Sequence, residues 1–141
     1  MIAKAATISH GGNAVRYSVN KDKAEIVKVN FLPDDISAEA MYQRMVLKQK
    51  EFASTINKGR PLKRNVIRME ISPTKEESAG WTLDDWVRLA NEYIQIFDSI
   101  DLSKKAKRAS AKCTNVRNSQ YIVALHHDAK SGIPHLHIDV N

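Results

Sequence analysis

Five short segments of the chain carry alternating or short apolar runs, which are patterns that indicate β-strands. These segments are residues 2–9, 24–31, 65–71, 120–126 and 136–140. In the third segment, Ile67, Met69 and Ile71 fall on one face of the strand, and Glu70 falls on the other. The sequence therefore predicts strands in these five places.

Two longer segments place their apolar residues at helical spacing. Residues 38–56, which follow a capping Ser37, have apolar positions at intervals of four, seven and four: Met41, Met45, Phe52 and Ile56. Residues 82–98, which a capping Thr82 begins, carry the clearest stripe: Trp86, Leu89, Ala90, Tyr93 and Phe97. A third, short helix is expected after Asn13, because His10-Gly11-Gly12 reads as a turn.

This order of elements predicts an α+β fold, in which an antiparallel sheet has helices packed on one face. A chain of 141 residues suits a single domain. The last strand runs almost to the final residue, Asn141, and domains rarely stop inside a strand. We therefore expect residues 1–141 to be the N-terminal portion of a larger protein, truncated at the C-terminus.

Composition narrows the class of protein. A hydrophobic fraction of 43% argues against disorder over the whole chain. No stretch reaches the roughly 18 apolar residues that a membrane helix needs, so no membrane span is expected. The single cysteine, Cys113, excludes an internal disulfide framework and a cysteine-rich zinc site. These features favour a cytoplasmic protein.

The charge is basic and unevenly distributed. The chain has 22 Lys and Arg against 16 Asp and Glu, a formal net charge of +6, which favours an anionic partner such as nucleic acid. Residues 103–118 contain no acidic residue and six basic ones: Lys104, Lys105, Lys107, Arg108, Lys112 and Arg117. Such a segment is either a solvated loop or a cationic loop that follows a phosphate backbone.

Four of the five histidines fall within residues 126–137. Because alternate side chains of a strand share a face, His135 and His137 point the same way, about 6–7 Å apart. The residues between and after them, such as Leu136 and Ile138, make the opposite face apolar, and that face is expected to pack on helices. Two neutral imidazoles on one face are a ready chelate for a divalent ion.

A third ligand is expected from the neighbouring strand, where His126 and His127 compete. Tyr121, Val123 and Leu125 share a face with His127, and this bulkier apolar set suits the helix-packed side. His126 is therefore favoured as the partner of the other two, with His127 as the alternative. Three histidines with open coordination positions are typical of a catalytic metal site.

The histidine segment resembles a motif of a known enzyme family. The run His126-His127-Asp128, followed by Pro134-His135-Leu136-His137 and Asn141, is similar to the third motif of conjugative relaxases, which belong to the nucleases named for a His-hydrophobic-His pair. The loop between Asp128 and His135 is a residue or two longer than in several relatives. The resemblance covers residues 1–20 and 120–141, with a weaker echo at 66–73.

The resemblance implies roles for further residues. Relaxases carry a catalytic tyrosine shortly after the first strand and a glycine-bearing segment, a position that Tyr17 matches, with Arg16 beside it as a DNA contact. Glu70 matches an acidic residue that lies behind the metal histidines in some relaxases, although it could instead pair with Arg68 or a surface lysine. The other tyrosines, such as Tyr93, fit packing positions better.

The implied activity is that of a relaxase nicking domain spanning residues 1–141. The tyrosine hydroxyl would attack one phosphodiester of single-stranded DNA at a plasmid or transposon transfer origin, leaving a 5′-phosphotyrosyl bond and a free 3′-hydroxyl. A divalent metal ion, Mg²⁺ or Mn²⁺, would assist, and accessory mobilisation proteins are expected partners.

Three other functions stay open. A replication-initiator nuclease of the same class shares the chemistry and differs in its DNA substrate. A histidine-metal hydrolase needs no tyrosine, and a cupin-like site expects a Glu where Asp139 comes too soon. A non-catalytic DNA-binding module would need neither metal nor tyrosine.

Overall fold

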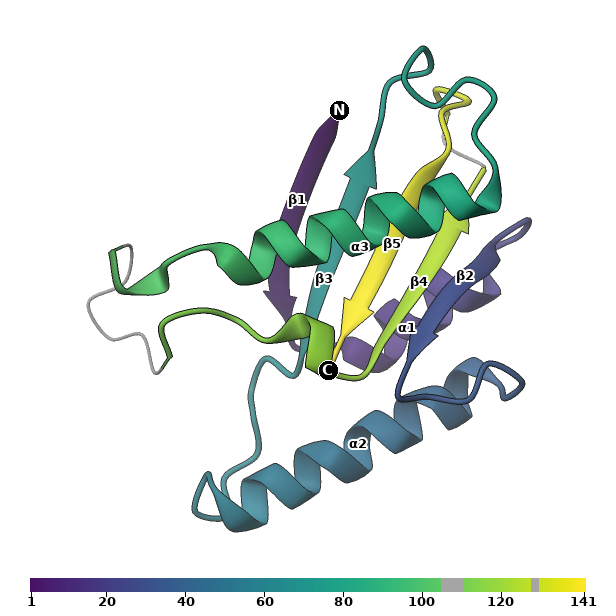
Figure 1. The fold of residues 1–141 in the computed structure, drawn as a ribbon. Coiled ribbons are helices and arrows are strands. Elements are labelled where there is room, and N and C mark those ends of the chain that lie inside the picture. Colours follow the sequence, from purple (N-terminus) through teal and green to yellow (C-terminus); the bar gives the residue numbers. More distant parts are fainter. Residues whose placement is uncertain (105–110, 128–129) are drawn as a thin grey trace.

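The computed structural model describes residues 1–104, 111–127 and 130–141. Its strands are β1 (Ile2–Ile8), β2 (Glu25–Asn30), β3 (Val66–Ser72), β4 (Tyr121–His126) and β5 (His135–Val140). They form a five-stranded sheet in the order β1-β3-β5-β4-β2, and each neighbouring pair is antiparallel (Figure 1). The strand from the C-terminal hairpin, β5, therefore lies at the centre of the sheet.

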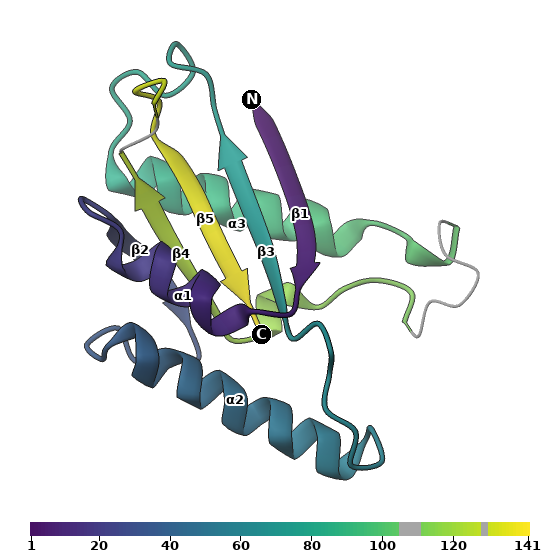
Figure 2. The ribbon, with the colours of Figure 1, turned by 180° about the vertical axis from the view of Figure 1, so that it is seen from behind.

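Three helices pack on this sheet: α1 (Gly11–Asn20), α2 (Ala38–Thr55) and α3 (Leu83–Ser99). The expected α+β class and antiparallel sheet are confirmed. The helices, however, are divided between both faces: α3 crosses one face, and α1 lies on the opposite face with α2 packed beside it (Figures 1 and 2). None of the helices in the described residues is long and apolar enough to cross a membrane.

The α3 face holds the larger core. Leu136, Ile138 and Val140 of β5 are buried in it, as the alternation along the strand predicts. The residues of α3 that are buried in this core are Trp86, Ala90 and Ile94. The expected stripe residues Leu89, Tyr93 and Phe97 lie beside them and are only partly buried. Thr82 is the N-cap of the helix, and its backbone N–H donates to the Asp85 carboxylate at 2.8 Å.

The opposite face holds a smaller core, built from α1, α2 and β4: Val15, Leu32, Ala38, Met41, Met45 and Ile122. Here the expected turn at Gly11-Gly12 is wrong, because both glycines lie in the first turn of α1. A methyl group on Gly11 would collide with Val66, and one on Gly12 would lie 2.9 Å from the Tyr42 ring. The glycines therefore let the start of α1 pack closely against α2 and β3, over the sheet.

Candidate metal centre and tyrosine pocket

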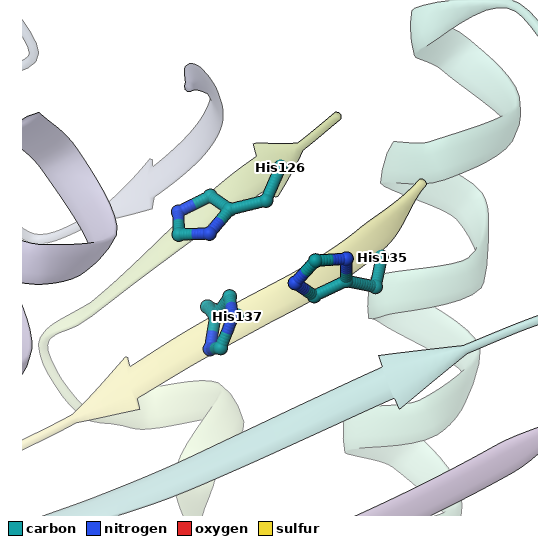
Figure 3. Close-up of side chains that lie close together, drawn as sticks. All are labelled: His126, His135 and His137. Carbon is teal, nitrogen blue, oxygen red and sulfur yellow. The ribbon is translucent and has the colours of Figure 1, made fainter. Parts of the chain in front are cut away.

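Three histidines meet on the sheet face that α1 partly covers. His126 ends β4 and is the register partner of His135, which begins β5, and His137 lies two residues further along β5. Taking one ring nitrogen from each, the three nitrogens lie within 4.8 Å of one another (Figure 3). The three histidines are therefore close enough to hold a metal ion, as the strand alternation predicts.

The chain fixes the tautomer of two of these rings. His126 is fully buried, and its Nε2 lies 2.9 Å from the backbone carbonyl oxygen of Ser18 in α1. A carbonyl oxygen only accepts, so Nε2 carries the proton and Nδ1 carries the lone pair that a metal needs. His135 is half-buried, and its Nδ1 makes a longer contact of 3.4 Å with the carbonyl oxygen of Ile133. This contact favours the tautomer in which Nε2 of His135 carries the lone pair available to a metal.

His137 sits in a more electropositive place. Its Nδ1 lies 3.2 Å from Nη2 of Arg68 on β3, and its Nε2 is buried with no hydrogen-bond partner in the described part of the chain. Burial first, and then the neighbouring charges of His126 and Arg68, lower the pKa of His137 to about 3. The ring is therefore neutral at physiological pH, which is the form that binds metal.

His127, the alternative first ligand, lies outside the cluster. Its side chain is exposed, and its Nε2 lies 2.8 Å from the Glu25 carboxylate on β2. Its neighbour Asp128 falls outside the described residues. The strand alternation accounts for the difference, because consecutive side chains of β4 point to opposite faces of the sheet.

Tyr17 of α1 stands against the histidine rings. Its ring centroid lies 5.4 Å from that of His126 and 5.5 Å from that of His137, and its side chain is 41% exposed. Two cations lie near the same ring: the Arg68 guanidinium carbon is 5.0 Å from the centroid and Lys21 Nζ is 5.2 Å away. The N-terminal tyrosine segment and the C-terminal histidine segment thus meet in space.

The other tyrosines occupy packing positions. Tyr121 is 3% exposed in the α3-side core, and Tyr93 is partly buried against the same core. The Tyr42 hydroxyl accepts a hydrogen bond from Asn65 at 2.9 Å. Of the four, Tyr17 is the one whose ring contacts the three-histidine cluster.

An open pocket of about 410 Å³ lies beside the tyrosine. Its walls combine Tyr17 and His135 with Glu70 and two cations, Lys21 and Lys130. Glu70 is the register partner of His137, but its carboxylate pairs with Lys4 at 3.3 Å, and the contact to that histidine comes from Arg68 instead. The site therefore places several positive charges around one carboxylate, which suits an anionic ligand.

Asp139 is buried on the same face of the sheet as the three histidines, and the sequence alone assigned no role to it. It follows His135 and His137 in the strand alternation, is 0% exposed, and is the register partner of Arg68. Burial raises the pKa of Asp139, and the Ser18 hydroxyl and the Arg68 charge oppose that shift. Its place among the histidines, away from the apolar face of β5, was the signal available in the sequence.

The described parts of the basic segment, residues 103–104 and 111–118, are not brought to the histidines. Lys104 ends a short 3-10 helix, η1 (Leu102–Lys104), and Arg117 lies in another, η2 (Val116–Asn118), which packs on α3 at the other face of the sheet (Figure 1). Lys112 is exposed in the same region, while Lys105, Lys107 and Arg108 fall outside the described residues. Arg16 is exposed on α1, where it donates to the Asn13 side chain.

The cations that do surround the tyrosine were not recognised from the sequence. Arg68 lies on β3 and meets the tyrosine through packing of distant segments, whereas Lys21 directly follows α1, four residues after Tyr17. The assembled site offers three imidazoles for a metal, a half-exposed phenol and an electropositive opening. No protein-family model matches the chain, and neither does any curated protein or solved structure.

Proposed function

We propose that this chain is the nicking domain of a relaxase, a metal-dependent transesterase that cuts single-stranded DNA with Tyr17. The observation that carries the proposal is the contact of Tyr17 with His126 and His137, at centroid distances of 5.4 and 5.5 Å. A phenol that only packed in a core would be buried, whereas this one is 41% exposed beside a pocket. A ring in this position can reach a phosphate that lies over the histidines.

The reaction exchanges one phosphate ester for another. Oη of Tyr17 attacks the phosphorus, an Oη–P bond forms, and the bond from phosphorus to the 3′-oxygen breaks. The proton lost by the phenol is balanced by the proton gained by the released 3′-hydroxyl. Because an ester bond is kept in the protein–DNA adduct, the same step in reverse rejoins the strand.

Side chains of the pocket assist the proton transfer and the charge. A phenol is a weak nucleophile while it is protonated, so a nearby acceptor is needed. Glu70 is the acidic group among the described residues that line the pocket with Tyr17, and it would take the proton directly or through a water molecule. Lys21 and Arg68, both near the phenol ring, would stabilise the negative charge that develops there.

The donor set fits a divalent ion held by His126, His135 and His137. The Nε2 of His137 is buried and lacks a hydrogen-bond partner within the described residues, so it would become a ligand atom once its proton moved to Nδ1. When bound, the ion would neutralise phosphate oxygens and make the phosphorus a better electrophile. Imidazole nitrogens suit Mn²⁺ and later transition metals better than Mg²⁺, so of the two expected ions we propose Mn²⁺.

The test is a covalent adduct. The protein is incubated with Mn²⁺ and single-stranded DNA of the transfer origin, or a randomised single-stranded pool, and adducts that survive detergent are digested and mapped by mass spectrometry. We expect a nucleotide bonded to Tyr17, and its loss in Tyr17→Phe. Tyr93→Phe, on the opposite face of the sheet, is the matched control and should keep the adduct.

Other outcomes would replace the proposal. Metal-dependent cleavage that survives in Tyr17→Phe would make the protein a histidine-metal hydrolase. Tight binding that is indifferent to chelator and to His135→Ala, with no cleavage of any strand, would make it a DNA-binding module. An adduct formed on replication-origin DNA but not on transfer-origin DNA would keep the chemistry and change the biological role to replication initiation.

A further inference from the structure

Arg68 contacts one of the three histidines that would bind the metal. Its Nη2 lies 3.2 Å from Nδ1 of His137. A guanidinium has donors only and stays protonated in proteins, so Nδ1 must be the acceptor of this hydrogen bond. The proton of the neutral His137 ring therefore sits on Nε2, which is buried.

Neither nitrogen of His137 can bind a metal while this hydrogen bond exists. If Nδ1 is the ligand atom, the guanidinium stands in the place of the ion. If Nε2 is the ligand atom, its proton must move to Nδ1, and two N–H groups of His137 and Arg68 then face each other. Metal binding and the Arg68–His137 hydrogen bond thus exclude one another, whichever nitrogen is used.

We propose that Arg68 is a displaceable positioning residue: it holds His137 when no metal is bound, and metal binding releases it toward the phosphate of the DNA. The first half rests on the histidine cluster alone, and the second half rests on the proposed nicking function. The released guanidinium has a short way to travel, since its carbon already lies 5.0 Å from the centroid of the Tyr17 ring.

The chemistry of arginine suits both states. A planar fork of N–H donors can hold one imidazole nitrogen in the metal-free protein and two phosphate oxygens in the complex. The register partner of Arg68 on β5 is the buried Asp139, and the charge of Arg68 favours ionisation of that carboxyl.

The first test measures metal affinity in the full chain without DNA. Co²⁺ or Mn²⁺ is titrated into the wild type, Arg68→Met and Lys4→Met. Met replaces the aliphatic part of the side chain and has no donor. We expect Arg68→Met to bind the metal about tenfold to a hundredfold more tightly, the range that loss of a competing charge-assisted hydrogen bond gives.

Lys4→Met is the control that tests whether removing a nearby positive charge, without removing a hydrogen bond to His137, is enough to tighten metal binding. Lys4 also acts on His137 through its charge, but it pairs with Glu70 and not with the ring. We expect its metal affinity to stay within about threefold of the wild type. Equal tightening in both variants, or no tightening in Arg68→Met, would overturn the exclusion. If neither the wild type nor Arg68→Met binds metal, the metal site itself fails.

Nitrogen NMR of the His137 ring gives an independent readout. In the metal-free wild type, Nδ1 should be the unprotonated, hydrogen-bonded nitrogen, and saturation with diamagnetic Zn²⁺ should abolish that pattern. A metal-bound ring that keeps its hydrogen bond from Arg68 contradicts the proposal. At saturating Mn²⁺, Arg68→Met should form the DNA adduct at least about tenfold more slowly. Tighter metal binding with an unchanged adduct rate would remove the phosphate role and leave the metal role standing.

Discussion

The ring of Tyr17 stands edge-on to the ring of His137, with centroids 5.5 Å apart and ring planes at 85°. The two residues come from opposite ends of the chain, and α1 brings them together by packing on β4 and β5. The Ser18 carbonyl of the same helix also fixes the tautomer of His126. One helix therefore positions the phenol and orients one ring of the histidine cluster, so the packing of α1 and the proposed metal site should respond to each other.

Metal binding should stabilise the fold through the three histidines. A ligand at about a hundred times its dissociation constant adds about 2.7 kcal/mol to the free energy of unfolding. We expect Mn²⁺ or Zn²⁺ to raise the melting temperature of the wild type, and His135→Ala to lose most of that increase. His127→Ala is the control, because His127 pairs with Glu25 away from the cluster. An equal loss in both variants would place the ion elsewhere.

The metal-free protein should lose stability in mild acid because of His137. Its pKa is about 3 in the folded protein, against 6.5 for an ordinary histidine. Between these values the unfolded chain binds more protons, so the free energy of unfolding falls as pH decreases from 6.5 toward 3. Melting curves in chelator at pH 7, 5.5 and 4 should show this fall, and His137→Asn should flatten it. A slope that His127→Asn flattens equally would point to general charging of histidines.

Asp139 should act in the opposite direction. Burial raises the pKa of this carboxyl above its usual 3.8, so its contribution to stability is present below pH 3.8 and is lost as pH rises through the folded-state pKa. Asp139→Asn avoids burying the charge and should be more stable relative to the wild type at pH 7 than at pH 4. The check is the difference in melting temperature between the two proteins at each pH. A difference that does not grow as pH rises would show that Ser18 and Arg68 compensate fully for the burial of the charge.

The histidine cluster could be predicted from the sequence because it depends on local alternation. His135, His137 and the choice of His126 over His127 all follow from which side chains share a face of two strands joined by a short connection. Arg68 could not be found in this way. It meets His137 because β3 lies beside β5, and the order of strands in a sheet depends on packing between distant segments.

The position of α1 also could not be predicted from local sequence patterns. The sequence indicates that Leu136 and Ile138 face helices, and α3 covers that face. It does not show that a second helix layer lies over the histidines, because α1 is short and its two glycines read as a turn. Their role is close packing against Val66 and Tyr42, which becomes visible only when those side chains are placed.

Gly11 should therefore be intolerant of a side chain. A methyl group there collides with Val66, which is 2% exposed and has little room to move. We expect Gly11→Ala to cost about 1–3 kcal/mol of unfolding free energy and to weaken metal binding by shifting α1. Val66→Ala opens the space, so the double variant should recover part of the loss in a double-mutant cycle. Full additivity in that cycle, measured by denaturant unfolding, would mean that the two side chains do not compete for the same space.

Binding of single-stranded DNA should depend on the cations of the pocket more than on the basic segment. Lys21 and Lys130 line the pocket beside Tyr17, whereas Lys112 and Arg117 lie on the α3 side of the sheet. For single strands, each phosphate contact contributes about −0.7 to the slope of log K against log salt concentration. Lys21→Ala with Lys130→Ala should reduce the size of that slope by about 1.4, and Lys112→Ala with Arg117→Ala should leave it nearly unchanged. Fluorescence anisotropy across a salt series, with Tyr17→Phe protein to prevent cleavage, measures both slopes. The reverse order would move the DNA path to the α3 side and away from the tyrosine.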